Sequence, residues 1–504
     1  MKRDPIKTAL VILTNLSVLL LLIIVIPESV NPSYIVNIIA IINIIAAFII
    51  LANRRSYEEK FTWILIILFL PIIGLVIYIF FGLDYELIRK NRGYIFSKEQ
   101  LKKAESETVF PNKFVKDFKN ELDFVKLIDK LSNKPINFYN KTTLLNNGDK
   151  FFPKLFEELE KAEEYIHLEY FIIKNGEIAD QLFEILCKKA KQGVEIRAMF
   201  DYFGAMSFSS PKIKELESYG GQVKFFNPLS IKTMLDGLNY RNHRKITVID
   251  GKIGFTGGIN IGDEYTHKDK YYGFWRDSHL MIEGGAVKSL HIVFIKDWFY
   301  RTNENLLTDK YLKTYEVEPK SGYCGVQIID DGPDSKRGIL KDVYFKAIME
   351  AQTDVMIATP YLVPDSEILE ALKISALSGV RVRIIVPGKP DKKLVYQATM
   401  SYFEELLESG CEIYFYGKNF LHSKIMVIDD HIASIGTTNI DFRSFHLHFE
   451  NTAILYKDKT IKDIIDSFEE DINLSKKIDR YKWSRRSYYK RFIETFARLF
   501  SPLF

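Results

Sequence analysis

Two copies of one residue pattern stand out in this sequence of 504 residues, one in each half of the chain. The pattern is a His followed by a Lys at +2, an Asp at +7, a Gly at +14 and an Asn at +17. Its members are His243, Lys245, Asp250, Gly257 and Asn260 in the first copy, and His422, Lys424, Asp429, Gly436 and Asn439 in the second. A five-position match arises by chance in about one chain of this length in ten thousand, so its repetition indicates a functional site.

The spacing of the histidine and the lysine suits the binding of a phosphate group. Side chains alternate between the two faces of a strand, so an imidazole and an ammonium at i and i+2 project to the same side. Two lysines, with Asn260 and Asn439 as amide donors, would stabilise the charge of a phosphodiester transition state without a metal ion. One neutral histidine can attack phosphorus while the other donates a proton to the leaving alkoxide. The pattern therefore predicts one phosphodiester-transfer site built from both copies, with no metal or other cofactor.

The motif aspartates, Asp250 and Asp429, complete the candidate catalytic set, but we expect them to act differently. Each lies seven residues beyond its histidine, and this odd step turns its side chain to the opposite face of a regular strand. We therefore expect both carboxylates to brace the fold or to form a salt bridge behind the site. Asp250 and Gly251 also predict a two-residue hairpin turn between strands at 246–249 and 252–256.

Around the motifs, amphipathic helical stretches alternate with short β-branched or aromatic runs, which indicates an α/β fold. This alternation occurs twice in the same order, so we interpret residues 136–315 and 316–475 as duplicated halves. In the first half we expect helices at 154–164, 177–192 and 211–219 and strands at 165–173, 194–201 and 223–226. In the second we expect helices at 337–352, 366–378 and 393–409 and strands at 355–359, 380–387 and 412–416.

The first 83 residues differ in composition from the rest and predict an amino-terminal membrane region. The apolar runs 8–26, 34–52 and 61–81 contain no charged residue, and each is near the length of about 20 residues that spans a bilayer. Positive residues before the first run and after the second place those ends in the cytoplasm. Pro71 and Gly74 interrupt the third run, so a spanning, a re-entrant and an interfacial segment all remain open. Residues 84–135 follow as a charged helical connector.

Composition excludes several other classes of site. The net charge of +4 is too small to indicate nucleic acid as the main partner. The three cysteines, Cys187, Cys324 and Cys411, lack the spacing of a disulfide framework or a zinc site. We interpret His446 and His448 as structural, because no third ligand stands near them at metal spacing.

The duplicated motif resembles that of the phospholipase D superfamily, and further blocks resemble the bacterial cardiolipin synthases over nearly the whole chain. These blocks are 69–82, 275–277, 359–365, 441–444 and 497–503. The resemblance implies two α/β/α halves related by a pseudo-two-fold axis, with one metal-independent site at their seam. It also implies that Asp277 and Glu450 orient the imidazoles, that His243 is the nucleophile, and that His422 is the acid and base. The implied reaction joins two phosphatidylglycerols through a phosphatidyl-histidine, releasing glycerol.

The carboxy-terminal segment 476–504 predicts contact with a membrane from its composition alone. Nine Lys and Arg residues alternate with Trp483, Tyr488, Tyr489, Phe492 and Phe496 between residues 476 and 498. This composition is typical of a basic amphipathic helix at an anionic bilayer. Together with the apolar runs, it predicts a multi-pass protein of the cell membrane, and the resemblance implies that this protein acts on phosphatidylglycerol. Hydrolysis of phospholipid or nucleic-acid phosphodiesters by the same site is the alternative, and a non-catalytic membrane scaffold is a third hypothesis, against which the intact His, Lys and Asn of both copies argue. The oligomeric state and the side of the membrane stay open.

Overall fold

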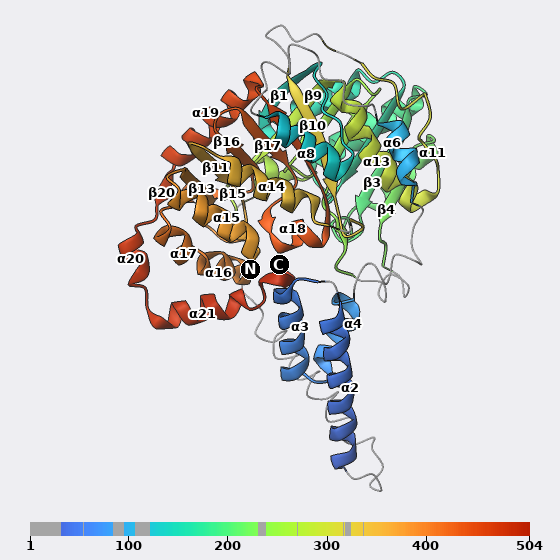
Figure 1. Ribbon diagram of the computed structural model, residues 1–504. Helices are drawn as coiled ribbons and strands as arrows, with labels where there is room; N and C mark the ends of the chain where they lie inside the picture. Colours follow the sequence, from blue (N-terminus) through green and yellow to red (C-terminus); the bar gives the residue numbers. More distant parts are fainter. Residues whose placement is uncertain are drawn as a thin grey trace. The chain divides into compact units, whose positions relative to one another are not determined.

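The computed structural model describes residues 32–53, 55–83, 95–105, 121–229, 238–269, 271–315, 317, 324–335 and 337–504. The chain forms two compact units, Met1–Gly82 and Leu83–Phe504 (Figure 1), and each is described by itself below. The expected apolar segment 8–26 lies outside the described residues, as does much of the expected connector.

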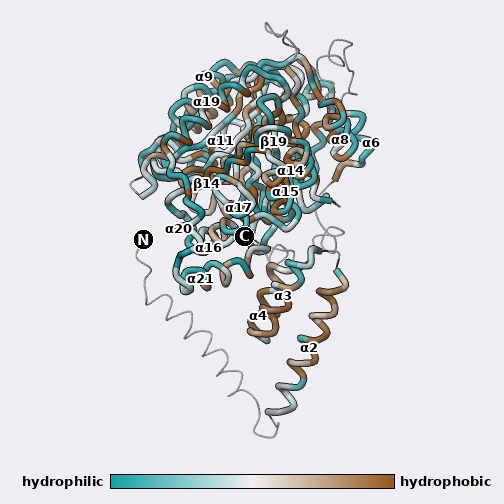
Figure 2. Tube along the Cα trace, turned by 60° about the vertical axis from the view of Figure 1, so that its left-hand side comes forward, coloured by the Kyte–Doolittle hydropathy of each residue, from teal (hydrophilic) through white to brown (hydrophobic). Residues whose placement is uncertain are grey.

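The amino-terminal unit contains three described helices, α2 (Pro32–Ala52), α3 (Tyr57–Phe69) and α4 (Ile73–Phe81). Figure 2 shows that they are apolar along most of their length. The expected segment 34–52 lies within α2. Within the described part of the chain, no helix combines the length and the apolarity that crossing a membrane requires.

The expected segment 61–81 is a helical hairpin and not one continuous helix. α3 ends at Phe69, and α4 begins after the turn that contains Pro71. The two helices then run antiparallel, since the rings of Trp63 and Tyr78 lie 5.3 Å apart. They also pack closely, because a Cβ atom on Gly74 would lie 2.4 Å from the carbonyl oxygen of Ile66. Both ends of this segment therefore lie at the same end of the hairpin.

The second unit is built on two mixed sheets. The first has seven strands in the order β1-β9-β7-β6-β2-β3-β4. In chain order its strands are β1 (Asn140–Asn146), β2 (Tyr165–Tyr170), β3 (Glu195–Asp201), β4 (Gln222–Phe226), β6 (Lys245–Ile249), β7 (Ile253–Gly257) and β9 (Ser278–Gly284). β2, β3 and β4 are parallel to one another, whereas β6, β7 and β9 pair in antiparallel fashion.

The second sheet repeats this arrangement, in the order β10-β19-β17-β16-β11-β13-β14-β20. Its strands are β10 (Gly325–Asp331), β11 (Asp354–Ala358), β13 (Arg381–Pro387), β14 (Glu412–Tyr416), β16 (Ile425–Ile428), β17 (Ile432–Gly436), β19 (His448–Tyr456) and β20 (Ser475–Lys477). Its first seven positions correspond one by one to those of the first sheet, and two strands are additional: β20 at the edge, and β5 (Arg241–Asn242) of the first half, which pairs with β19. The prediction of two repeated α/β halves is thus confirmed.

Helices cover the outer faces of the sheets. They are α9 (Asn147–Glu160), α10 (Glu177–Lys191) and α11 (Ser210–Ser218) in the first half, and α14 (Ile339–Glu350), α15 (Ser366–Leu377), α16 (Lys393–Ser401) and α17 (Phe403–Glu408) in the second. The expected helix 393–409 is therefore divided, at Tyr402. Two further helices, α13 (Ala286–Thr302) and α19 (Lys459–Asn473), follow the equivalent strands β9 and β19.

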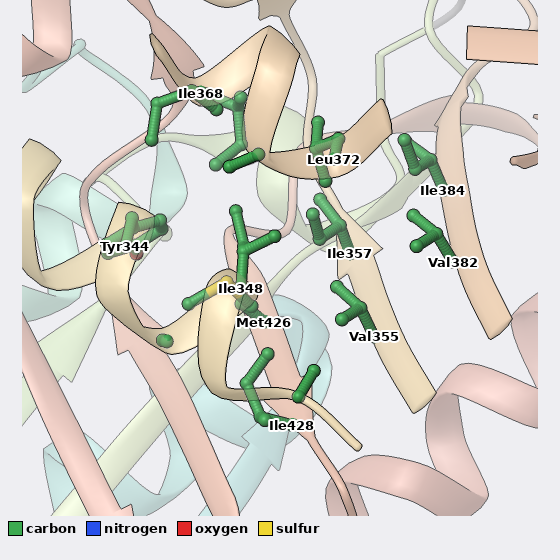
Figure 3. Packing of buried hydrophobic residues seen from close by; sticks show 14 of the residues in the cluster. Tyr344, Ile348, Val355, Ile357, Ile368, Leu372, Val382, Ile384, Met426 and Ile428 are labelled. Atoms are coloured by element: carbon green, nitrogen blue, oxygen red, sulfur yellow. The ribbon is translucent and has the colours of Figure 1, made fainter. Parts of the chain in front are cut away.

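The hydrophobic core explains why both halves form one unit. Along β11, Val355 and Ile357 pack outward against α14 and α15 (Figure 3), whereas Met356 and Ala358 face a second cluster. This second cluster combines α13 and strands of the first half with strands of the second. Each sheet therefore buries both faces, and one of them is buried against the other half.

The motif aspartates hold the end of the sheet that lies away from the imidazoles. The carboxylate of Asp250 accepts backbone hydrogen bonds of 2.8 Å from Glu163, Glu164 and Tyr165. Asp429 accepts the equivalent bonds from Gln352, Thr353 and Asp354. The hairpin at Asp250 has three residues and not the predicted two, since Ile249 pairs with Ile253.

We expect Asp250→Asn and Asp429→Asn to lower stability more than chemistry. An amide has one oxygen in place of two, so at least one backbone N–H that the carboxylate now satisfies would be left unpaired at about 1–3 kcal/mol. Thermal unfolding in detergent should show a melting temperature several degrees lower. Asp430→Asn is the matched control, because Asp430 has the same left-handed backbone but is 84% exposed. A variant that melts like the original chain and has no activity would contradict the bracing role.

Candidate active site

The two motifs meet at the seam between the halves, because each half lends a strand to the other. β5 (Arg241–Asn242), just before the first motif, pairs in parallel with the start of β19. β15 (Asn419–Leu421), just before the second motif, pairs in parallel with β8 (Phe274–Arg276) of the first half. The backbone N–H of His243 thus donates to Phe449 at 2.9 Å, and that of His422 donates to Arg276 at 2.7 Å.

His243 is aligned by a carboxylate of the second half. Its Nδ1 lies 3.0 Å from both carboxylate oxygens of Glu450, which is fully buried. Thr437 donates its hydroxyl hydrogen to the same carboxylate. With Nδ1 held in this way, Nε2 is the ring nitrogen left for chemistry.

His422 is aligned in the mirrored manner by the first half. Its Nδ1 lies 2.7 Å from Oδ2 of Asp277, which is also fully buried. The other oxygen of Asp277 accepts the backbone N–H of Ser278 at 2.8 Å. Each imidazole is therefore oriented across the seam, and neither half holds a complete histidine–carboxylate pair of its own.

Both motif lysines lie on the same side of the chain as their histidines. Lys245 Nζ donates to the carbonyl of His243 at 2.6 Å, and Lys424 Nζ donates to that of His422 at 2.5 Å. Both lysine side chains are almost fully buried. The structure thus brings two imidazoles and two ammonium groups together in a site with little access to water.

Burial and mutual repulsion shift the ionisation of this group. Burial, followed by the charges of Lys245, Lys424 and His422, lowers the pKa of His243 well below its usual value. Burial and Lys424 also lower the pKa of His422, to about 4. Both imidazoles are therefore neutral at pH 7, which suits a nucleophile. A proton donor must instead gain its proton when an anionic phosphate enters, since that charge raises the pKa again.

Burial also shifts the ionisation of both lysines, and repulsion adds to it at Lys245. Burial and the charge of Lys424 lower the pKa of Lys245 well below its usual value. Burial lowers the pKa of Lys424 to about 8, although Asp277 and Glu450 act against it. Although burial alone would raise its pKa, His422 and Lys424 keep the pKa of Asp277 below its usual value. A phosphodiester would relieve the repulsion between these cations, so the site is electrostatically suited to an anion.

The other sequence-predicted residues lie at different distances from the imidazoles. Asp250 lies five residues beyond Lys245 along an extended strand, about 17 Å away. It therefore cannot touch the phosphate, and Asp429 is placed in the same way.

Asn260 donates to the hydroxyl of Tyr265 at 2.8 Å, and Asn439 donates to Asp441 at 3.1 Å. Each amide has a second N–H that these bonds leave over.

Sequence reasoning missed two kinds of residue at this site. Aromatic rings surround the imidazoles: Phe171 lies 5.1 Å from His243, while Trp275 and Phe420 lie 5.4 and 5.9 Å from His422 between ring centroids. The position of Phe420 two residues before His422 is a signal of the kind used for the lysines, since i and i−2 share a face. Phe171 and Trp275 come from other strands, so no local spacing marks them.

His448 is the second omission, and it corrects the expectation that no third metal ligand stands nearby. Ligand atoms of His243, His448 and Glu450 lie within 4.8 Å of one another. The expectation was wrong because β19 brings His448 beside the first motif. Arg443, however, donates to Nε2 of His448 at 3.0 Å, and the two motif lysines add positive charge. This electrostatic environment disfavours a metal cation and favours an anion.

Comparison with known proteins agrees with this geometry. The family described as "Cardiolipin synthase, PLD-like domain" matches residues 155–290 and 344–472, which contain both motifs. The family described as "Phospholipase_D-nuclease N-terminal" matches residues 35–82. Among solved structures, a phosphatidylserine synthase from Haemophilus influenzae superposes with a TM-score of 0.57 at 16% identity, covering 75% of this chain and 97% of that one. This last likeness concerns the fold alone.

Similarity to curated relatives extends over almost the whole chain. A cardiolipin synthase of Geobacillus sp. (strain WCH70) is 43% identical over 461 residues, covering 91% of each chain. The major cardiolipin synthase ClsA of Bacillus subtilis (strain 168) is 36% identical over 485 residues, covering 94% of this chain and 99% of the relative. With the duplicated fold and the shared site, these matches show that the chain belongs to the cardiolipin synthase family of phospholipase D-like enzymes.

Proposed function

We propose that this enzyme transfers a phosphatidyl group from one phosphatidylglycerol to another, giving cardiolipin and glycerol. The observation that carries the proposal is the crossed alignment of the two imidazoles. Glu450 of the second half orients His243, and Asp277 of the first half orients His422. A two-step displacement requires two such groups at one phosphorus, because the nucleophile cannot also protonate the leaving group.

In the first step, Nε2 of neutral His243 attacks the phosphorus of the donor lipid. The bond between phosphorus and the glycerol headgroup oxygen breaks, and His422 transfers a proton from Nε2 to that oxygen. Glycerol leaves, and a phosphatidyl group stays on His243. The negative charge of the bound phosphate raises the pKa of His422, so this imidazole is protonated when the lipid binds. Lys245 and Lys424 stabilise the phosphoryl oxygens.

In the second step, a headgroup hydroxyl of another phosphatidylglycerol takes the place of glycerol. His422, now neutral, accepts the proton of that hydroxyl as its oxygen attacks phosphorus. The nitrogen–phosphorus bond breaks, and cardiolipin is released with His243 restored. The side chains of His243 and His422 are only 9% and 11% exposed. Such burial favours a lipid hydroxyl over water as the acceptor, because it limits the access of bulk solvent.

Purified enzyme incubated with labelled phosphatidylglycerol in mixed micelles and excess EDTA should form cardiolipin and glycerol in equal amounts. His243→Ala and His422→Ala should each lower the rate at least ~10^3-fold, since both residues act as one unit. Lipid analysis by chromatography gives both products. Phosphatidic acid without cardiolipin would show that water is the acceptor and would contradict the transfer reaction. Full activity in either variant would contradict the shared site.

We further propose that the amino-terminal unit embeds the enzyme in the cell membrane. On α2, large apolar side chains are exposed, including Ile38, Ile41 and Phe48 at 56%, 56% and 68%. At the tip of the α3–α4 hairpin, Leu68 and Phe69 are 64% and 80% exposed. Surfaces of this kind are stable against lipid and costly in water. Segments 8–26 and 34–52 would cross the bilayer as a pair, although α2 alone falls short of the length and apolarity that a crossing requires, and the hairpin would enter it and return.

This topology places the catalytic unit in the cytoplasm. The second segment ends at positive residues, Arg54 and Arg55, which prefer the inside. Because the hairpin returns to the side it left, the chain after Gly82 stays on that side. The sequence after Gly82 agrees with this placement, because it contains the positive residues Arg89, Lys90 and Arg92, which would oppose a third crossing.

Labelling of single introduced cysteines in intact bacteria tests this topology. With a maleimide that cannot cross the membrane, Asp430→Cys should react only after permeabilisation, because Asp430 is exposed on the catalytic unit. Ser29→Cys, in the loop between the first two segments, is the control and should react in intact cells. The native cysteines are buried and give the background. Labelling of Asp430→Cys in intact cells would show that the third segment crosses.

A further inference from the structure

The end of the chain forms a helix whose charged face is turned toward the protein. α20 (Arg480–Ser484) leads to α21 (Tyr488–Arg498), which packs along α16 (Figure 1). Arg491 donates to Glu404 of α17, and Arg498 donates to Glu405. Glu494, only 2% exposed, accepts from Arg486 at 2.8 Å. Ion pairs therefore attach the inner face of α21 to the second half of the enzyme.

The outer face of α21 is aromatic, so the usual polarity of a surface helix is reversed. Tyr488, Tyr489, Phe492, Phe496 and Leu499 are 87%, 73%, 69%, 50% and 41% exposed. From Tyr489 to Leu499 the spacing is three to four residues, and Tyr488 lies four residues before Phe492, so all five fall in one broad stripe along the helix. A helix on a protein in water normally buries such a stripe and exposes its charges. This stripe is instead presented outward by a helix that is already fixed by its polar face.

Exposed cations flank the aromatic stripe. Arg480, Lys482, Arg485 and Lys490 are all exposed, and among the described residues none of them pairs with a carboxylate. Arg485 lies 4.0 Å over the ring of Tyr481, which is itself 60% exposed. Tyrosine and phenylalanine at the depth of lipid headgroups, beside Lys and Arg that meet anionic phosphates, are the chemistry of an interfacial helix.

We propose that α21 lies in the headgroup region of an anionic bilayer, with Tyr489, Phe492 and Phe496 inserted. The helix thereby turns the active-site rim, which is the segment 389–392 before α16, toward the lipid. This inference rests on the proposed function, because inserting α21 into the bilayer helps only an enzyme whose substrate is a lipid. A lipid enzyme gains when its substrate passes from the bilayer to the site without crossing water. The occupant is a membrane rather than a protein because α21 is already packed by its polar face, while the exposed cations at α20 and Lys490, which pair with no carboxylate among the described residues, precede or accompany the stripe along the chain.

The helix is connected to the active-site rim through α16. The segment 389–392, immediately before α16, bridges the seam: Lys389 donates to the carbonyl of Tyr271, and the hydroxyl of Tyr271 donates to the carbonyl of Pro390 at 3.4 Å. Tyr272, the neighbour of Tyr271, packs its ring 5.0 Å from that of Trp275, which lies 5.4 Å from the imidazole of His422, so this segment lies close to the active site. A membrane that holds α21 would therefore also lie near the mouth of the site.

An environment-sensitive fluorophore on Phe492→Cys measures insertion directly. The full-length enzyme is reconstituted in vesicles of phosphatidylglycerol and phosphatidylcholine, and the same fluorophore on Leu377→Cys is the control. Leu377 is 71% exposed on α15, outside the stripe. The emission of the Phe492 label should shift to the blue and be quenched by lipids that carry a quencher in the acyl chain. Emission at Phe492 equal to that at Leu377 would overturn the proposal, whatever the enzyme's activity.

Activity on two physical forms of the substrate tests the consequence. The triple variant Tyr489→Ser, Phe492→Ser, Phe496→Ser should lose at least ~10-fold of its rate on vesicles. It should keep its rate on monomeric short-chain phosphatidylglycerol within about twofold, as should Leu377→Ser on both substrates. Equal loss on both substrates would show that α21 only supports the fold. A wild-type dimer that the triple variant converts to a monomer would assign the stripe to a second copy. Either result would overturn the proposal.

Discussion

The hydrogen bonds that join each imidazole to a carboxylate of the opposite half constrain the whole catalytic unit. Glu450 can reach His243 only if β5 lies along β19, and Asp277 can reach His422 only if β15 lies along β8. These two strand pairings between the halves are equivalent, and they create the pseudo-symmetry of the site. A half-enzyme would leave Glu450 or Asp277 buried without its imidazole, and an unpaired buried carboxylate is strongly destabilising. Folding and assembly of the site are thus one event.

Electrostatics gives the site its preference for a phosphodiester. Two lysines and two imidazoles are buried together, and burial lowers the pKa of each of the four side chains, with a further contribution from neighbouring cations at His243, Lys245 and His422. Such an arrangement is stable because Asp277 and Glu450 are buried beside it. The cluster of lysines and imidazoles becomes more favourable when an anion enters. The binding energy therefore comes from contact with the phosphoryl group. The same charges explain how His422 can be neutral in the free enzyme and still act as an acid with substrate bound.

Local patterns predicted most of the fold and the centre of the site. The i, i+2 spacing predicted His243 and Lys245 on one face. The odd step does not account for Asp250, because this residue lies in the turn after β6 with a φ of 52°, where the regular alternation of a strand has ended. The repeated order of helices and strands predicted both halves, since each element has its own periodicity. His448 could not be found in this way, because its proximity to His243 depends on pairing between β5 and β19. The sequence leaves the hairpin at Pro71 as one of several alternatives, because the hairpin depends on the packing of α3 on α4, which no local pattern shows.

The central claim is that both motifs act on one phosphorus, with His243 as the nucleophile. Covalent trapping tests it most directly: the enzyme is mixed with phosphatidylglycerol labelled in its phosphate, quenched under alkaline denaturing conditions during turnover, and digested. Mass spectrometry should find the phosphatidyl group on the peptide that contains His243, and His243→Asn should abolish it. Label on the peptide that contains His422, or undiminished label in His243→Asn, would contradict the account.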